Sequence, residues 1–340
     1  MRPLRVLVIG GTGIISSAVV SAAAARGHDV HVLNRSTSGI RPLPPGVQQH
    51  IADVRDAGAV DRALAGESFD VVAQFLAFTP EHIAQDVRTF SGRTDQYIFV
   101  SSASAYQTPP THLPITESTP LSNPFWAYSR DKIASEDALM HAYRRDGFPI
   151  TIVRPSHTYD PTMVPFDGGW TIVDRMRRGA AVIVPGDGTS LWTITHHTEF
   201  AVGFVGLFGQ PRAIGEAFHI TSDEAPTWNA IYHAIARAAG VEARLVHVAS
   251  DAIAAVDPEW GAALLGDKAN SMVFDNTKIR GLVPEFRPVI PFARGAEEII
   301  AWHDAHPEAR TVDRRLDRLM DRLADAYRPR PLVNESEVSA

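Results

Sequence analysis

The apolar residues at the start of the chain fall in short runs, which are separated by a glycine turn and a helix-forming stretch. Residues 5–9 and 30–33 are apolar runs, and an alanine-rich stretch over 14–26 lies between them. A short apolar run bounded by turn residues is typical of a buried parallel strand, and an alanine-rich stretch is typical of a helix. The pattern therefore predicts a strand, a glycine turn, a helix and a second, parallel strand.

The same alternation continues along the chain. Further strands are expected at 47–51, 69–75, 96–101, 150–154 and 216–221. Further helices are expected at 57–65, 81–90, 125–145, 228–239 and 312–327, the last with an apolar face for packing. Strands that alternate with helices indicate the α/β class, and here they predict a Rossmann-type, doubly wound parallel sheet.

The regular pattern ends after Pro155, where prolines and glycines separate shorter elements. The expected strand at 216–221 returns the chain to the first sheet, so a smaller, discontinuous C-terminal domain is expected beside the sheet domain. The dinucleotide-binding domain is expected to comprise residues 1–155 with about 196–224. The second domain is expected to comprise about 156–195 with 225–328, and a disordered tail is expected at 329–340.

Composition narrows the classes of protein that need to be considered. The 340 residues carry 32 basic and 39 acidic side chains, a net charge of −7, and no cysteine. An acidic balance argues against a nucleic-acid partner, and the absence of cysteine excludes disulfides and thiolate chemistry. No apolar run has the length of a membrane span, and no signal-peptide pattern is present. We expect a cytoplasmic protein without a membrane partner.

The turn after the first strand has the pattern of a phosphate-binding loop. It runs Gly10-Gly11-Thr12-Gly13-Ile14-Ile15-Ser16 and opens the first helix. Glycine lets phosphate oxygens approach the backbone, and the helix N-terminus offers free N–H groups and a partial positive charge. Ser16 stands where glycine or alanine is usual, and serine is small enough to fit. The residues expected to contact a dinucleotide here are Gly10, Thr12, Gly13, Ile14 and Ile15.

The end of the second strand indicates which dinucleotide is bound. An acidic residue usually stands there and bonds the ribose 2′-hydroxyl of NAD, but this chain has Asn34, Arg35 and Ser36. An arginine suits a 2′-phosphate, because the two form charge-assisted hydrogen bonds. NADP is therefore the expected cofactor, with NAD as the alternative. Asp53 and Val54, just after the third strand, are expected near the adenine.

A tyrosine and a lysine four residues apart indicate the chemistry. Tyr128 and Lys132 share one face of the helix expected at 125–145, and lysine occurs at only two other positions, Lys268 and Lys278. A phenol with a pKa of about 10 is a poor base near neutral pH, and a neighbouring ammonium is expected to lower that pKa. Tyr128 would then take a proton from a secondary alcohol while hydride leaves to a nicotinamide.

A serine-rich stretch follows the strand expected at 96–101 and supplies further polar groups. Ser102 and Ser104 lie in it. Sites in parallel sheets form at the carboxyl ends of strands, so a hydroxyl here can bond both the substrate oxygen and Tyr128. Alone this stretch is a weak indication, and it gains weight from the tyrosine and lysine.

Together these motifs resemble the extended short-chain dehydrogenase/reductases, the group of NAD-dependent nucleotide-sugar epimerases and dehydratases. The resemblance also rests on Arg154-Pro155 to Tyr159-Asp160-Pro161, Gly186-Asp187-Gly188, Gly266-Asp267 and Phe274 to Lys278. It implies that Ser102, Tyr128 and Lys132 form the catalytic triad, with Lys132 also at the nicotinamide ribose. The further cofactor contacts that it implies are Leu76, Ala77, Pro155 and His157.

The chain departs from the family pattern in the stretch after Ser102. Dehydratases and decarboxylases of this group carry an acid there, whereas this chain has Ala103, Ser104 and Ala105. Without an acid to move a second proton, elimination of water is disfavoured. Epimerisation and simple oxidation or reduction remain.

The chain also departs from the pattern that holds a nucleotide diphosphate. The resemblance places an asparagine and two arginines at positions that hold His157, Trp192 and Leu264 in this chain. None of these side chains binds phosphate as a fork. The residues that could compensate are Arg175, Arg177, Arg178 and Lys268; without them the substrate is not a standard sugar nucleotide.

These observations leave a ranked set of functions. The first is an NAD(P)-dependent epimerase of a sugar-type secondary alcohol, acting by transient oxidation. The second is an NADPH-dependent reductase or dehydrogenase of a sugar-like or other small polar carbonyl compound, and the third is a non-enzymatic cofactor sensor or RNA-binding relative.

The expected partners are a small polar substrate, sugar-like or nucleotide- or nucleoside-like, and a second copy of the chain packed through the helices at 81–90 and 125–145. The residues expected to meet the substrate are Ser102, Ser104, Tyr128, His157, Trp192 and His196, and no spacing indicates a metal.

Overall fold

The centre of the protein is a seven-stranded parallel sheet, seen in a computed structural model that describes residues 2–35 and 40–328. The strands are β1 Arg5–Ile9, β2 Asp29–Asn34, β3 Gln48–Ile51, β4 Phe69–Gln74, β5 Thr94–Val100, β6 Ile150–Pro155 and β10 Ala217–Ile220. Their order across the sheet is β10-β6-β5-β4-β1-β2-β3, with parallel pairing throughout. The order reverses between β1 and β4, and ligands of open α/β sheets bind at such a switch point.

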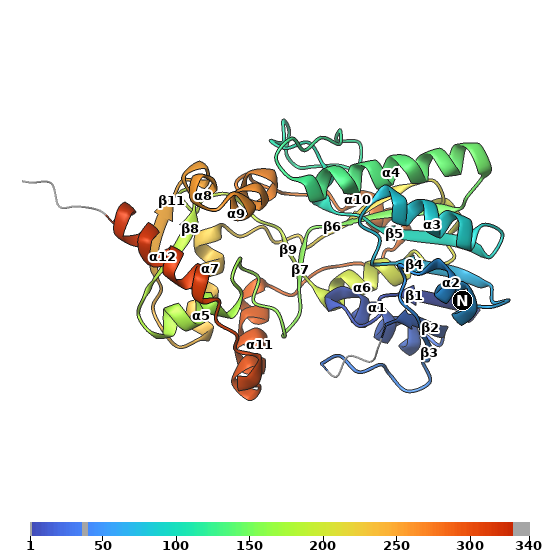
Figure 1. Cartoon of the computed structure of the whole chain (residues 1–340), viewed down its shortest axis with the longest axis horizontal. Helices are drawn as coiled ribbons and strands as arrows, with labels where there is room; N and C mark the ends of the chain where they lie inside the picture. Colours follow the sequence, from blue (N-terminus) through green and yellow to red (C-terminus); the bar gives the residue numbers. More distant parts are fainter. Residues whose placement is uncertain (1, 36–39, 329–340) are drawn as a thin grey trace, which may run out of the picture.

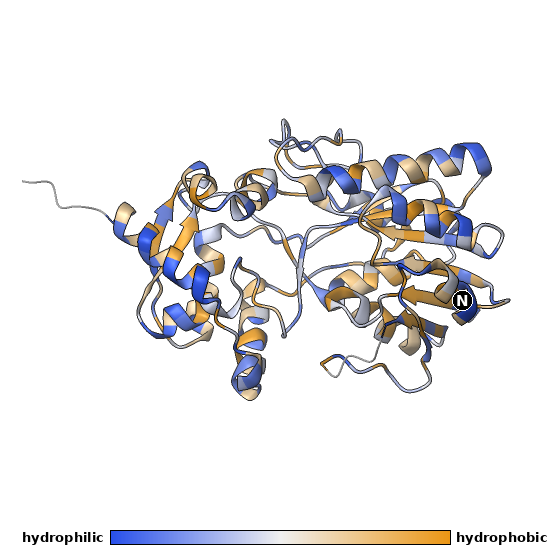
Figure 2. Cartoon of the chain, viewed as in Figure 1, coloured by the Kyte–Doolittle hydropathy of each residue, from blue (hydrophilic) through white to orange (hydrophobic). Residues whose placement is uncertain are grey.

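Helices cover both faces of this sheet (Figure 1). One face carries α1 Ile14–Ala25 and α6 His197–Gly206, and the other carries α2 Ala57–Ala63, α3 Pro80–Phe90 and α4 Ala127–Asp146. The strands are buried on both faces, so they consist of near-continuous apolar residues such as Val6 to Ile9. Figure 2 shows hydrophobic residues concentrated in the strands and hydrophilic ones on the outer sides of α3 and α4.

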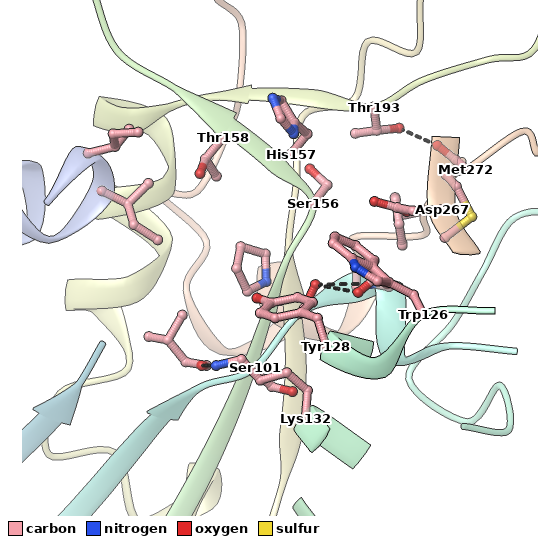
Figure 3. A pocket seen from close by; sticks show the side chains of 18 of the residues that line it. Ser101, Trp126, Tyr128, Lys132, Ser156, His157, Thr158, Thr193, Asp267 and Met272 are labelled. Carbon is pink, nitrogen blue, oxygen red and sulfur yellow. Dashed lines mark hydrogen bonds between the residues drawn. The ribbon is translucent and has the colours of Figure 1, made fainter. Parts of the chain in front are cut away.

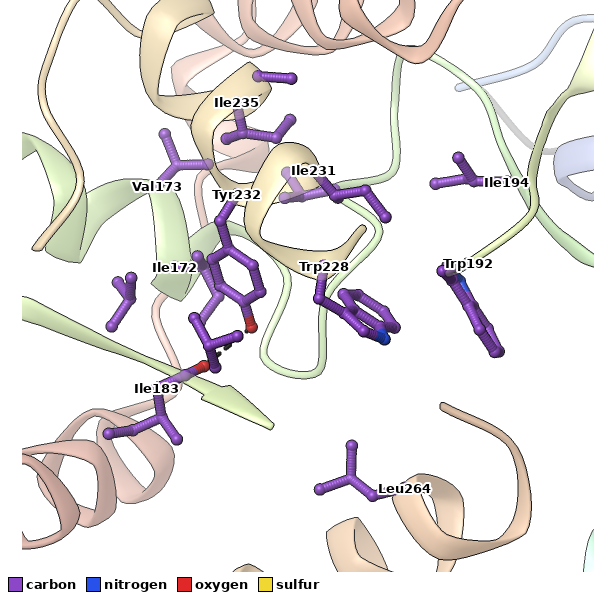
Figure 4. Close-up of a cluster of buried hydrophobic side chains, with 14 of the residues drawn as sticks. Ile172, Val173, Ile183, Trp192, Ile194, Trp228, Ile231, Tyr232, Ile235 and Leu264 are labelled. Carbon is purple, nitrogen blue, oxygen red and sulfur yellow. Dashed lines mark hydrogen bonds between the residues drawn. The ribbon is translucent and has the colours of Figure 1, made fainter. Parts of the chain in front are cut away.

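A second unit packs beside the carboxyl end of the sheet. Its elements are α5 Trp170–Arg177, β8 Ala181–Pro185, α7 Trp228–Ala238, β11 Arg244–Val248, α8 Ser250–Val256, α9 Pro258–Ala263, α11 Phe292–Ala305 and α12 Arg314–Tyr327. β8 and β11 form a parallel pair, and α12 packs on it with a buried apolar stripe that includes Leu316 and Leu323. Figure 4 shows the core of this unit, where the Tyr232 hydroxyl donates to the carbonyl of Ile183 at 2.9 Å.

Two short segments join the units. β7 His157–Tyr159 and β9 Ile194–His196 pair in parallel where the chain crosses between them (Figure 1). α10 Thr277–Leu282 then returns to the sheet, and Ile279, Val283 and Phe286 are buried in the cluster formed by α1 and α6. The division into two domains remains a proposal, but assigning all of 225–328 to the second domain was wrong for α10. α10 and the residues after it pack against the sheet domain, because their apolar side chains are buried beside α1 and α6.

The predicted α/β class and the doubly wound parallel sheet are confirmed. Each strand and helix expected up to residue 155 is present, and the differences lie at the ends of elements. The short elements after residue 155, such as β7, β9 and α10, had no pattern strong enough for prediction. The tail at 329–340 and Ser36 lie outside the described residues, so the expectations for them stay untested.

Candidate active site

The glycine turn after β1 leaves no room for side chains. Gly10 has a φ of +84°, and a Cβ there would lie 2.5 Å from Leu76 Cγ. A Cβ on Gly11 would lie 2.8 Å from both methyl groups of Val32. Ser16, at the position usually held by glycine or alanine, is buried and donates through its hydroxyl to the Gly10 carbonyl at 2.6 Å. The backbone at this turn is therefore open to a phosphate group.

A hollow of about 300 Å³ adjoins this turn at the end of β2. The residues that line it are Gly10, Thr12, Gly13, Leu33, Asn34, Arg35, Ala52, Val54 and Leu76. Asn34 is buried and its Nδ2 has no hydrogen-bond acceptor among the described residues, and no described carboxylate pairs with Arg35. An unpartnered amide donor beside a guanidinium suits an oxygen-rich or anionic group, so these residues fit the adenosine end of a nicotinamide dinucleotide. Asp53 is exposed between Ala52 and Val54 and accepts from the Arg55 N–H at 2.9 Å.

A larger cavity of about 330 Å³ lies between the sheet and the second unit (Figure 3). Residues from both units form it: Ile14, Ile15, Phe75, Phe78, Val100, Ser101, Ser102, Ala103, Ser104, Trp126, Tyr128, Lys132, Pro155, Ser156, His157, Thr158, Met163, Trp192, Thr193, Asp267, Met272 and Phe274. Most of the residues predicted for the nicotinamide and the substrate therefore meet in one place. We call this space the central cavity.

The serine loop after β5 holds Ser102 at the edge of the central cavity. The Ser104 N–H donates to Ser102 Oγ at 3.2 Å, and the two hydroxyl oxygens are 2.9 Å apart. Ser129 Oγ donates to Ser104 Oγ at 2.8 Å. If Ser104 donates onward to Ser102, the Ser102 hydroxyl keeps its own proton for the tyrosine or a substrate. Ser104 also lines the cavity, but both of its hydroxyl contacts are to Ser102 and Ser129, so its role here is to position Ser102.

Tyr128 enters the central cavity from the first turn of α4. Burial raises its pKa to about 12; a hydrogen bond with the Ser102 side chain opposes that shift, and the charge of Asp267 adds to it. The expectation that Lys132 lowers this pKa was wrong for this structure. The Lys132 nitrogen lies 5.8 Å from the centre of the tyrosine ring, and burial dominates.

Lys132 is held by the backbone of two strand ends. It is 1 % exposed, and its ammonium donates to the carbonyls of Ala77 and Val100, each at 2.8 Å. The nitrogen also lies 4.8 Å from the ring centres of Phe78 and Phe99. Burial lowers the pKa of Lys132 to about 7. Ala77, predicted as a cofactor contact, therefore contributes its carbonyl to positioning the lysine.

One turn along α4, a buried ion pair supports this lysine. Glu136 accepts from Arg154 Nε at 2.9 Å and from the Ser101 hydroxyl at 2.5 Å. Arg154 lies on β6 and both partners are nearly inaccessible to solvent. The Glu136 charge also raises the pKa of Lys132 and so opposes the effect of burial. The pair ties α4 to β6 and the serine loop.

The opposite wall of the central cavity is aromatic and has few internal hydrogen bonds. Burial and the charge of Lys268 lower the pKa of His157 to about 3, so its ring is neutral, and its Nε2 has no described partner. Trp192 is 2 % exposed, stacks on Trp228 at 5.3 Å, and has an unpartnered Nε1 among the described residues. The carboxyl group of Asp267 also lines this wall.

Some predicted site residues lie elsewhere. His196 does not line the central cavity, because its ring is held by Glu298 at 3.1 Å and by Thr198 at 2.7 Å. The expectation that it meets the substrate was wrong. Leu264 is buried in the core of the second unit and is also absent from this cavity.

The basic residues expected to compensate for the missing phosphate clamp are all engaged in ion pairs away from the central cavity. Arg175 binds Asp317 and Asp321, and Arg177 binds Asp304 at 2.8 Å. Arg178 pairs with Asp174, and Lys268 pairs with Asp167. Lys132 is the one lysine or arginine that lines the cavity in the described part of the chain. The expected compensation was therefore wrong, and none of the described residues provides a diphosphate clamp in the cavity.

Sequence reasoning did not single out Trp126, Thr158, Thr193, Asp267 or Met272, which also line the central cavity. Gly266-Asp267 carried part of the resemblance, and that segment was the available indication for Asp267. Over residues 2–35 and 40–328, no group of three or more histidines and carboxylates is arranged to hold a metal ion. None of the described helices is long and apolar enough to cross a membrane.

Comparisons with known proteins give the following matches. The family model of the NAD dependent epimerase/dehydratase family matches residues 6–221. A 2'-dehydrokanamycin reductase of Streptomyces kanamyceticus is 28 % identical over 293 residues, covering 84 % of this chain and 79 % of the relative. A UDP-glucose 4-epimerase of Lactobacillus helveticus is 31 % identical over 168 residues, 44 % of this chain and 51 % of the relative. The structure of the epimerase Mth375 of Methanothermobacter thermautotrophicus superposes with a TM-score of 0.75 and 18 % identity, covering 91 % of this chain and 94 % of that one.

Proposed function

The chain belongs to the NAD dependent epimerase/dehydratase family and is an enzyme of the extended short-chain dehydrogenase/reductase type, and on this premise we propose that it reduces a polar, sugar-like carbonyl compound with NADPH. The observation that carries the proposal is the make-up of the central cavity. Ser102 and Tyr128 meet there, and Lys132 is the single cation among its described lining residues.

A cavity without a diphosphate clamp favours net reduction over epimerisation. An epimerase must hold its oxidised intermediate while the ketone turns, so that hydride returns to the other face. A bound diphosphate can serve as that anchor, but Arg175, Arg177 and Arg178 are all engaged by carboxylates elsewhere. A reductase needs no such anchor, because its product leaves after one hydride transfer. The reductase relative, matched over 84 % of this chain, supports the same reaction.

The protonation state of Tyr128 suits the direction of reduction. With its pKa raised to about 12 by burial, the phenol is protonated near neutral pH. A nicotinamide dinucleotide, when bound, supplies the hydride to the carbonyl carbon. Tyr128 donates its proton to the carbonyl oxygen, so that C=O becomes CH–OH, and the Ser102 hydroxyl orients that oxygen. Water then returns a proton to the phenolate left behind.

The hollow at the end of β2 supports NADP as the cofactor, with NAD as the alternative. Asn34 Nδ2 and the Arg35 guanidinium are both donors, whereas the ribose 2′-hydroxyl of NAD is best held by a carboxylate. Two donors without a nearby described acceptor fit a 2′-phosphate. Lys132 uses two of its N–H groups on carbonyls, which leaves one for the nicotinamide ribose.

The test is a turnover assay with NADPH and 2'-dehydrokanamycin, followed by a panel of other keto sugars. We expect the absorbance at 340 nm to fall by one NADPH for each alcohol formed, and to fall more slowly with NADH. Cofactor that stays bound through purification, with conversion of substrate and no net change at 340 nm, would contradict the proposal.

Epimerisation is the second candidate, and the match to the Lactobacillus helveticus enzyme favours it over about half of each chain. The same samples incubated with UDP-glucose and NAD test it. Formation of the C4 epimer would support this candidate, and a lack of any epimer would leave reduction as the better account.

We also propose a homodimer through α3 and α4, which lie side by side on one face of the sheet (Figure 1). Light scattering after gel filtration should give twice the chain mass of 37.0 kDa. A monomeric mass at micromolar concentration would contradict this arrangement.

A further inference from the structure

Asp267 is a desolvated carboxyl group at the central cavity, and burial raises its pKa to about 7. It is the one aspartate or glutamate among the described residues that line the cavity. The cation of the cavity, Lys132, directs its N–H groups at the carbonyls of Ala77 and Val100. No described donor forms a hydrogen bond with the Asp267 carboxyl group, so it is available to a cationic ligand, which would favour its ionised form.

The turn that carries Asp267 is held firmly in place. It is a single π-helical turn, Leu264–Lys268, and such turns often occur at functional sites. The Gly266 carbonyl accepts from Asn123 Nδ2 at 2.6 Å, and a Cβ on Gly266 would lie 2.6 Å from that of Trp126. The turn therefore packs directly against the start of α4 and fixes Asp267 relative to the tyrosine.

The basic neighbour of Asp267 points away from the cavity. Lys268 does not line the central cavity and instead donates to Asp167 at 3.3 Å. Among the described residues Lys268 forms no ion pair with Asp267 and acts on it only through its charge, which opposes the rise in the pKa of that carboxyl group. A desolvated carboxyl group resists ionisation, and a cationic ligand beside it stabilises the carboxylate form.

The surroundings of Asp267 suit a cation that is carried on a polar ring. Figure 3 shows Asp267 entering the cavity beside Thr193 and Met272, above Trp126 and Tyr128. The rings of Trp126 and Tyr128 have centres 4.8 Å apart and offer faces that attract a cation. Thr158 brings a hydroxyl group to the cavity for a sugar-like ring, whereas the hydroxyls of Ser156 and Thr193 already bond Thr195 Oγ1 at 2.8 Å and the Met272 carbonyl at 2.7 Å. A phosphate group would meet this carboxyl group, and Lys132 is the one described lysine or arginine that lines the cavity.

We propose that Asp267 binds an ammonium group of the substrate, so that the enzyme acts on an amino sugar or an amino cyclitol and not on a nucleotide sugar. This inference rests on the proposed carbonyl reduction, because it names the substrate class for the same cavity. Asp267 is then a specificity-determining residue, and Tyr128 carries the proton transfer.

Matched ligands test the proposal by binding alone. Methyl α-D-glucoside is compared with its 2-amino, 3-amino and 6-amino derivatives, each titrated into the full chain with NADP⁺ present and followed by calorimetry or ligand-observed NMR. At least one amine should bind about tenfold or more tightly than the parent glucoside, as a charge-assisted hydrogen bond provides. N-acetylation of that amine should remove the advantage.

Asp267→Asn should abolish the preference for the amine while leaving the affinity for the parent glucoside and for NADP⁺ unchanged. Asn is close to isosteric with Asp, and an unchanged melting temperature checks folding. Asp251→Asn, an exposed change on α8, is the matched control and should keep the preference. The proposal is overturned if no amine exceeds the parent glucoside, or if Asp267→Asn retains the preference.

The two proposals can fail separately. If amines are preferred through Asp267 but NADPH is never consumed with any keto amino sugar, the binding inference stands and the proposed reduction fails. If neutral keto sugars are reduced as well as amino ones, with the same rates in Asp267→Asn, the reduction stands and the inference fails.

Discussion

The two walls of the central cavity differ in how their polar groups are satisfied. The catalytic wall (Ser102, Tyr128 and Lys132) comes from the sheet domain, and its serine and lysine are bonded to neighbouring groups. The recognition wall (His157, Trp192 and Asp267) faces it, and among the described residues His157 Nε2 and Trp192 Nε1 have no partner and no donor bonds the Asp267 carboxyl group. Groups that are already satisfied keep a fixed geometry, whereas unsatisfied ones gain from a ligand. The difference suits the catalytic wall to the chemical step and the recognition wall to the choice of substrate.

The largest expected effect comes from breaking the catalytic wall at its proton donor. Tyr128→Phe removes the phenolic proton and should lower kcat for carbonyl reduction by about 10³-fold. NADPH affinity should be unchanged, because the cofactor contacts remain. Single-turnover oxidation of NADPH at 340 nm measures the loss, and Tyr143→Phe on the same helix is the control. Undiminished turnover in Tyr128→Phe would remove this residue from the chemistry.

The next largest effect is on stability, and it comes from the buried Glu136–Arg154 ion pair behind the catalytic wall. Glu136→Gln leaves the buried Arg154 without its counter-charge, which should lower the free energy of unfolding by about 3 kcal/mol. Urea unfolding followed by circular dichroism measures it. The control is Glu297→Gln, whose pair with Arg294 is exposed and should matter by less than about 1 kcal/mol. Equal effects of the two changes would show that the buried pair gives no special support.

Cofactor choice should respond to a single residue outside both walls. Arg35→Ser removes the guanidinium from the hollow at the end of β2 and should lower the ratio of kcat/KM for NADPH over NADH by about 10- to 100-fold. Steady-state rates with both cofactors measure the ratio, and Arg62→Ser on the exposed side of α2 is the control. A ratio that does not move would favour NAD as the native cofactor.

The smallest effect concerns the pH dependence of stability. Burial lowers the pKa of Lys132 from 10.5 to about 7 in the folded protein, so between these pH values the unfolded chain binds more protons. The contribution of this group to the free energy of unfolding therefore rises with pH across that window. In Lys132→Met the rise between about pH 7.5 and about pH 9.5 should be smaller than in the parent protein.

The control for this measurement is Lys278→Met, because the Lys278 ammonium is partly exposed and pairs with Glu216. Its pH dependence should match that of the parent protein. If the free energy of unfolding rose less steeply with pH in both variants, burial of Lys132 would not be the cause of the rise in the parent protein.

The catalytic wall was largely predictable from the sequence, and the recognition wall was not. Tyr128 and Lys132 are four residues apart on one helix, so their joint position follows from helix geometry. Ser102 follows a strand at the edge where parallel-sheet sites form. Asp267 and Thr193 come from distant segments that meet only through the packing of the second unit. His196, predicted as a substrate contact, is taken up by Glu298, a pairing that no local pattern indicates.

By itself, the sequence determined the alternation of strands and helices, the glycine turn and the tyrosine–lysine pair, because each depends on residues that are close along the chain. The tertiary structure decided which charged side chains form ion pairs and which line the central cavity. It placed Arg175, Arg177, Arg178 and Lys268 in ion pairs outside the central cavity and left Asp267 as the one described carboxyl group that lines it. It also raised the pKa of Tyr128 through burial, where the sequence predicted a lower value. Pairing and desolvation depend on the three-dimensional neighbours of a group, and spacing along the chain does not specify them.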